Sequence, residues 1–227
     1  MELAGATWSQ VEATGRRSVL AVPLGSTEQH GPHLPLDTDT RVAGAVVAGL
    51  AAQVTDLFVA PPLAYGASGE HAAFGGTLLV GHGVLAEVLS ELVRSARHAF
   101  RGVVFVSAHG GNHEALATVS ARSAAEGDDV LVWSVHVPDG DAHAGRTETS
   151  LMLAIEPEAV RLPLAQAGCS EPLDVLLPRL RTVGVRPVSS NGVLGDPSGA
   201  NAEEGRALLS SLVSDLAETV SARWPSA

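Results

Sequence analysis

Short apolar runs alternate with longer amphipathic segments along this chain, and that alternation restricts the folds open to it. Segments with apolar residues at helical spacing cover 40–54, 83–100, 114–126, 148–155 and 202–223. Between them, apolar runs of strand length lie at 17–25, 57–63, 102–108 and 130–137. Apolar strands separated by helices are typical of a mainly parallel sheet covered on both faces. We therefore predict an α/β fold, with residues 162–200, rich in Pro and Gly, left unassigned.

The length and composition fit one catalytic domain. At 227 residues with 45% hydrophobic residues, the chain can bury a substantial core. No linker rich in Pro, Gly and Ser divides it into two self-sufficient halves. We predict a single domain over residues 1–227.

Charge and cysteine content exclude several classes of partner. The net charge of −11 disfavours nucleic acid and anionic membrane surfaces, because both need clustered basic residues. The sequence carries one cysteine, Cys169, so no intramolecular disulfide forms, and no histidine follows it in a pattern typical of a thiolate nucleophile. No signal peptide and no apolar run of roughly 20 residues is found. We expect a soluble cytoplasmic protein.

The segment Glu28–Asp39 follows the first apolar run and holds two imidazoles and three carboxylates. Such groups are costly to bury without a partner, and imidazole with carboxylate suits zinc, iron or manganese. Glu28 and His30 are two residues apart, so an extended backbone points both to the same side. A carboxylate such as Asp39 can bridge two metal ions about 3.5–4 Å apart. The alternative is a polar turn in which Asp39 only caps the next helix.

Two further polar clusters follow later apolar runs. His109 precedes Gly110 and Gly111, which allow a tight turn beside a ligand, although a histidine bonded to a loop carbonyl fits equally. Farther on, His143 could act as an acid, a base or a hydrogen-bond donor, while Glu148 could bind a second metal or favour a helix N-terminus. Because the carboxyl ends of parallel strands meet at one sheet edge, we expect the clusters to converge.

Two other residues are weaker candidates. His71 follows a glycine-rich loop, and Asn112 follows the His109 cluster. We predict that both contact substrate or support the metal ligands from behind. Three other histidines are predicted to be structural or on the surface: His82, His98 and His136.

The motifs EQHGPHLP at 28–35, Asp39, HGGN at 109–112 and HAGRTETS at 143–150 together resemble the creatininase family. The resemblance implies a three-layer α/β/α fold, a two-metal site, hydrolysis of amide bonds and a homo-oligomer. By motif, it assigns Glu28 and His109 to one metal ion and His30 to the other, with Asp39 bridging both. Creatininase itself has an acidic residue where Gly111 stands here, so we expect Glu148 to replace that ligand.

The segments 140–150 and 191–197 resemble one member of the family more closely. That member removes a modified C-terminal dipeptide from a small ribosomally made peptide during synthesis of a redox cofactor. The resemblance thus implies a peptidase with two divalent ions, zinc or iron(II) or both, with manganese possible. Two alternatives stay open: a related amidohydrolase acting on a cyclic amide or formamide, and a metal-dependent binding protein without turnover.

Overall fold

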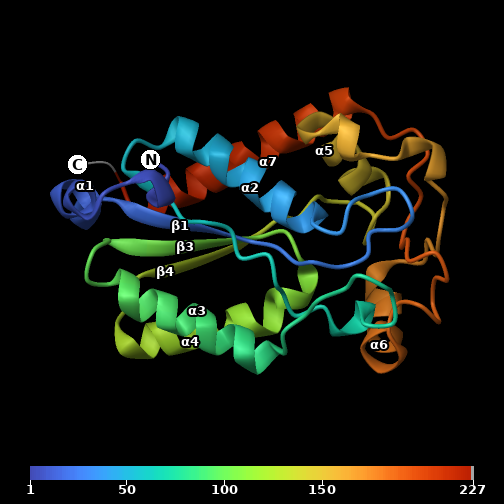
Figure 1. Cartoon of the computed structure of the whole chain (residues 1–227), viewed down its shortest axis with the longest axis horizontal. Coiled ribbons are helices and arrows are strands. Elements are labelled where there is room, and N and C mark those ends of the chain that lie inside the picture. The colour runs from blue at the N-terminus through green and yellow to red at the C-terminus, as the bar shows by residue number, and fades with distance from the viewer. Residues whose placement is uncertain (226–227) are drawn as a thin grey trace.

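The computed structural model describes residues 1–225, and within them four strands form one parallel sheet (Figure 1). The spatial order is β2-β1-β3-β4. Every predicted strand is present, although β2 ends before Pro61 and Pro62, where proline cannot donate to the ladder. The strands are β1 (Val19–Leu24), β2 (Leu57–Val59), β3 (Gly102–Ser107) and β4 (Val130–Ser134).

Helices cover both faces of the sheet, which confirms the α/β/α arrangement (Figure 1). One face carries α2 (Thr38–Gln53), α5 (Arg146–Ile155) and α7 (Ala202–Arg223). The other carries α3 (His82–Ala96) and α4 (His113–Glu126). The prediction that residues 1–227 form a single domain is not tested by this arrangement and stays a prediction.

Alternate residues of each central strand enter different cores. In β1, Val19 and Ala21 pack under α2 and α7, whereas Leu20 and Val22 pack against α3 and α4. The same alternation in β3 sends Phe105 to the second core. Because both faces of the sheet are buried, these strands read in the sequence as continuous apolar runs.

Shorter elements complete the description. The unassigned region 162–200 contains α6 (Leu173–Val183), which includes Pro178 and buries Leu176 and Leu180 in a small separate cluster with Val185. In residues 1–225, no helix is long and apolar enough to cross a membrane. The remaining elements are α1 (Trp8–Thr14) and the 3₁₀ turns η1 (Leu3–Gly5), η2 (Gly15–Arg17), η3 (Gly69–His71), η4 (Gly110–Asn112), η5 (Pro157–Ala159) and η6 (Leu162–Leu164).

The strand order places a switch point between β1 and β3. The chain leaves β1 through α2 to β2 on one side, whereas β3 pairs with β1 on the other side, with Leu24 opposite Ser107 at their carboxyl ends. A crevice at such a point is the usual ligand site of an open parallel sheet. The loops that follow β1 and β3 both begin there.

Candidate metal centre

The five predicted metal ligands converge at the carboxyl end of the sheet. Glu28 and His30 lie in the loop after β1, and Asp39 lies in the first turn of α2. His109 lies two residues after the end of β3, while Glu148 lies in the first turn of α5. Residues from four parts of the sequence thus meet because their strands or helices end or begin at the same edge.

Asp39 stands between two pairs of side chains. Its Oδ2 is 3.3 Å from His109 Nδ1, and its Oδ1 is 3.2 Å from His30 Nε2. Beyond these imidazoles, Glu28 Oε2 is 3.2 Å from His109 Nε2, and Glu148 Oε2 is 3.8 Å from His30 Nε2. Each oxygen of Asp39 therefore faces a different imidazole, as a carboxylate between two metal ions would.

The donor atoms fit divalent cations. Both carboxylate oxygens of Glu28 are buried and accept no hydrogen bond from residues 1–225. A buried, unpartnered carboxylate is costly, and a cation would offset that cost. The imidazole of His30 donates from Nδ1 to the Glu28 carbonyl oxygen at 3.1 Å when Nε2 is bare, which leaves Nε2 for a metal.

The electrostatics of the cluster separate the ligands into two kinds. Burial raises the pKa of Glu28 and of Glu148 to about 7. Burial alone would lower the pKa of both ligand histidines, but the charge of Asp39 raises that of His30 to about 10, and the charge of Glu28 raises that of His109 to about 9. Burial also opposes ionisation of Asp39, yet the neighbouring histidines hold its pKa well below its usual value. The two ligand histidines of the metal-free cluster therefore hold protons that a bound cation would replace.

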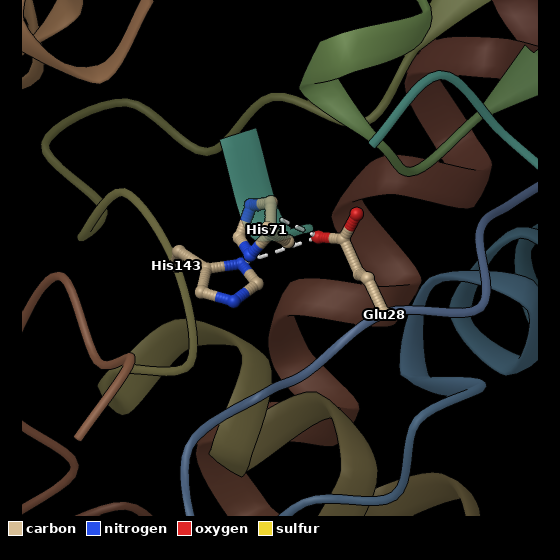
Figure 2. Close-up of side chains that lie close together, drawn as sticks. All are labelled: Glu28, His71 and His143. Atoms are coloured by element: carbon tan, nitrogen blue, oxygen red, sulfur yellow. Dashed lines mark ion pairs between the residues drawn. The ribbon is translucent and has the colours of Figure 1, made fainter. Parts of the chain in front are cut away.

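His71 and His143 lie against the same oxygen of Glu28 (Figure 2). His71 ends η3, and its Nε2 is 3.3 Å from Glu28 Oε1. His143 lies before α5, with Nδ1 3.8 Å from Glu28 Oε1 and 4.0 Å from Glu148 Oε2. Burial and the charge of His109 lower the pKa of His71 to about 3, while burial and the charge of His30 lower that of His143 well below its usual value.

Asn112 lies behind the centre and is fully buried. Its side chain accepts from the Ala67 backbone N–H at 2.9 Å and donates to the Gly25 carbonyl oxygen at 3.1 Å. These contacts join the loops after β1 and β3 to the glycine-rich loop. They support a role in positioning backbone, in keeping with the prediction that Asn112 acts from behind the ligands.

Two supporting residues were not predicted. Ser26 donates from Oγ to Asp39 Oδ2 at 2.7 Å, and Gln29 contacts both His71 and His143. In the sequence, Gln29 stands between the predicted ligands Glu28 and His30, and this position could have indicated a supporting role. Two of the three histidines predicted to be structural or on the surface, His98 and His136, are exposed.

A cavity of about 410 Å³ opens onto the centre. Its walls include Asp39, His109, His143 and Glu148. A second cavity of about 570 Å³ shares with it the segment 139–142. Volumes of this size accommodate a ligand of several residues beside the candidate metal centre.

An imidazole–carboxylate centre at the carboxyl edge of a parallel sheet, open to a cavity, defines a candidate metal-dependent hydrolase. The chain belongs to the creatininase family: the family model described as creatinine amidohydrolase matches residues 4–220. A mycofactocin precursor peptide peptidase of Mycobacterium tuberculosis (strain CDC 1551 / Oshkosh) is 47% identical over 98% of this chain and 91% of its own length.

Solved creatininases share the fold. A structure described as "Creatininase Mn" has a TM-score of 0.82 and 26% identity, covering 99% of each chain. A Zn-Zn type of a creatininase mutant has a TM-score of 0.81 and 26% identity, covering 99% of this chain and 98% of that one. The predicted family, fold and closer resemblance are confirmed, as is the prediction of a hydrolase acting on amide bonds.

Proposed function

We propose that this protein is a two-metal peptidase that releases the modified C-terminal dipeptide from a mycofactocin precursor peptide. The observation that carries the metal dependence is the unpartnered, buried carboxylate of Glu28 among imidazoles, beside a cavity. The name of the 47% identical relative supports the choice of substrate. A homo-oligomer and a cytoplasmic location remain predictions from the sequence.

The proposed ligand sets follow the two pairs around Asp39. Glu28 and His109 would hold one ion and His30 and Glu148 the other, with Asp39 between them. The donor set accepts zinc, manganese and iron(II). When bound, such ions supply Lewis acidity and lower the pKa of water.

The protein's own groups would manage the proton and the substrate. His143, at the cavity wall, is placed to take up at Nδ1 the proton released when water attacks and to return it to the leaving amine. The cavity would hold the peptide with its scissile bond beside the centre. His71 lies against Glu28 and is not one of the described residues that line the cavity, which favours a supporting role over substrate contact.

Metal analysis of the wild type and Asp39→Ala tests this proposal. We expect about two divalent ions per chain in the wild type, and loss of at least one ion together with peptide cleavage in the variant. Asp37→Ala is the matched control, because Asp37 is partly exposed and pairs with Arg41 at 2.7 Å. A wild type that binds no metal on reconstitution would refute the metal mechanism.

Mass spectrometry of a modified-peptide digest tests the substrate. Release of a C-terminal dipeptide is the expected result. The match to the creatinine amidohydrolase family model favours a second candidate, a hydrolase of cyclic amides or formamides. Two bound ions with no peptide cleavage and turnover of such an amide would establish that candidate instead, and absence of all turnover would indicate a binding protein.

A further inference from the structure

Glu28, His71 and His143 have donor atoms within 4.8 Å of one another, a spacing that a single metal ion could also use (Figure 2). Whether the three residues can bind a metal ion together depends on which nitrogen of each imidazole carries its proton. Gln29 contacts both rings on the side away from Glu28. Gln29, Glu28, His71 and His143 are all buried.

The orientation of the Gln29 amide is fixed by two backbone groups. Its Oε1 accepts from the Gly31 N–H at 2.9 Å, and its Nε2 donates to the Gly192 carbonyl oxygen at 3.0 Å. In a flipped amide, the NH₂ group would face the Gly31 N–H and the oxygen would face the Gly192 carbonyl oxygen, so neither hydrogen bond could form. Gly192 permits this contact because a Cβ there would lie 1.8 Å from Gln29 Oε1.

The fixed amide determines the proton position on His71. Gln29 Nε2 lies 2.9 Å from His71 Nδ1, and its second hydrogen is the one available there. His71 Nδ1 must therefore be an acceptor, and the proton of the neutral ring is on Nε2. That N–H lies next to Glu28 Oε1, 3.3 Å away.

The backbone of the same residue determines the proton position on His143. His143 Nε2 is 2.8 Å from the Gln29 carbonyl oxygen and 3.0 Å from Gln29 Nε2. Gln29 Nε2 has two hydrogens, and both are already donated, one to the Gly192 carbonyl oxygen and one to His71 Nδ1. A bare nitrogen beside the Gln29 carbonyl oxygen would place two lone pairs together, so Nε2 carries the proton. The lone pair of His143 is then on Nδ1, which faces Glu28 and Glu148.

We propose that Gln29 is a positioning residue that gives two adjacent imidazoles opposite polarity. Its side chain keeps the proton of His71 on Nε2, the nitrogen nearer Glu28, and its carbonyl oxygen leaves the lone pair of His143 on Nδ1. The imidazoles in Figure 2 then present an N–H (His71) and a bare nitrogen (His143) on the side of Glu28, so His71 has no lone pair there for a third metal ion. The effect on catalysis rests on the proposed function, whereas the proton positions do not.

Nitrogen NMR of histidine-labelled, zinc-loaded protein reads the proton positions directly. In the wild type, we expect both His71 and His143 to be protonated at Nε2. Gln29→Glu presents an acceptor to His71 and should move its proton to Nδ1, while His143 stays unchanged because its partner is backbone. Gln29→Met should remove the preference of His71 alone.

Kinetics and metal content give a second readout. Gln29→Met should lower kcat by roughly 10–100-fold, with little change in KM and about two ions retained per chain. Thr77→Val is the control, because Thr77 Oγ1 accepts from the Gln29 N–H at 3.3 Å without contacting either imidazole in the described chain. This control should preserve both proton positions.

A wild-type His143 protonated at Nδ1, or a His71 that keeps its proton on Nε2 in Gln29→Glu, would overturn the proposal. If the variants do not fold, the wild-type spectrum still decides. Failure of peptide cleavage with the expected proton positions would refute the proposed substrate and leave the role of Gln29 intact.

Discussion

His30, His71 and His143 lie close together, but the group bonded to the far nitrogen of each imidazole differs, and so does the chemistry open to each ring. By accepting from Nδ1, the Glu28 carbonyl oxygen would leave the Nε2 of a neutral His30 free for a metal ion. The Gln29 carbonyl oxygen leaves His143 with a bare Nδ1, whereas the Gln29 amide leaves His71 with an N–H. The residue type alone therefore does not define the role of a histidine here; the atom that meets its far nitrogen does.

His143→Ala should separate catalysis from metal binding. Because His143 Nδ1 is 3.8 Å from Glu28 and 4.0 Å from Glu148, it can exchange a proton beside the centre without being one of the five proposed ligands. We expect turnover of the peptide to fall by roughly 10²–10⁴-fold with metal content close to wild type. Steady-state kinetics and elemental analysis measure the two quantities.

His98→Ala is the matched control, because His98 is an exposed histidine. It should leave both turnover and metal content unchanged. Loss of one ion in His143→Ala would contradict the acid–base role and identify His143 as a ligand.

The candidate ligands could be predicted from the sequence because charged groups beside apolar runs are conspicuous. The structure brings Glu28, His30 and Asp39 together with His109 and Glu148, while their roles as ligands stay predictions. Gln29 could not be predicted in the same way. Its amide is uncharged, and its partners lie 42, 114 and 163 residues away, so local spacing carries no trace of them.

At the scale of elements, α7 determines where α5 lies. Gly205 of α7 packs against the Ser150 carbonyl of α5 so closely that a Cβ would lie 1.8 Å from that oxygen. Glu204 reinforces the contact, accepting from Ser150 Oγ at 2.9 Å and from Arg146 Nε at 2.9 Å. Since α5 carries Glu148, the position of one proposed ligand depends on this helix pair.

Gly205→Ala should force α5 and α7 apart. We expect the free energy of unfolding to fall by about 1–3 kcal/mol, the usual cost of overpacking, and the affinity for the second metal ion to weaken. Denaturant unfolding and metal titration measure these effects.

Gly44→Ala in α2 is the control: nothing lies within 4 Å of its added Cβ, so helix propensity should stabilise the protein by up to about 1 kcal/mol. Equal effects at the two positions would refute the close-packing argument.

Prediction from sequence succeeded for elements with strong periodicity. The strands β1, β2 and β3 are buried throughout, so nothing in their apolar composition conflicts with their role. Helix α2 begins at Thr38, two residues before the predicted start at 40, a difference within the usual spread of helix-end assignment. The sequence does not predict α6, because Pro178 interrupts the helical pattern; Leu176 and Leu180 of this helix are buried in the small separate cluster.

At the scale of the whole molecule, the candidate metal centre destabilises the folded protein when no metal ion is bound. Glu28 is fully buried, and its pKa of about 7 compares with 4.5 when exposed. Since the unfolded chain releases this proton more readily, the metal-free protein loses stability as pH rises from 4.5 to 7, and the loss is constant above that range. The pKa difference corresponds to about 3 kcal/mol. A bound cation would offset this loss by binding only the folded state.

Glu28→Gln tests this balance because it removes the charge and keeps the shape. Without metal at pH 8, we expect the variant to be more stable than wild type by up to about 3 kcal/mol, and the difference to vanish near pH 4, where wild-type Glu28 is protonated. With zinc, the order should reverse, since the wild type gains stability from binding and the variant lacks a ligand. Thermal unfolding with and without a chelator measures both cases.

Glu218→Gln, at an exposed position of α7, is the control and should change stability neither with nor without zinc. A metal-free variant less stable than wild type at pH 8 would show that Glu28 is satisfied without a cation, which would remove the main support for the metal centre.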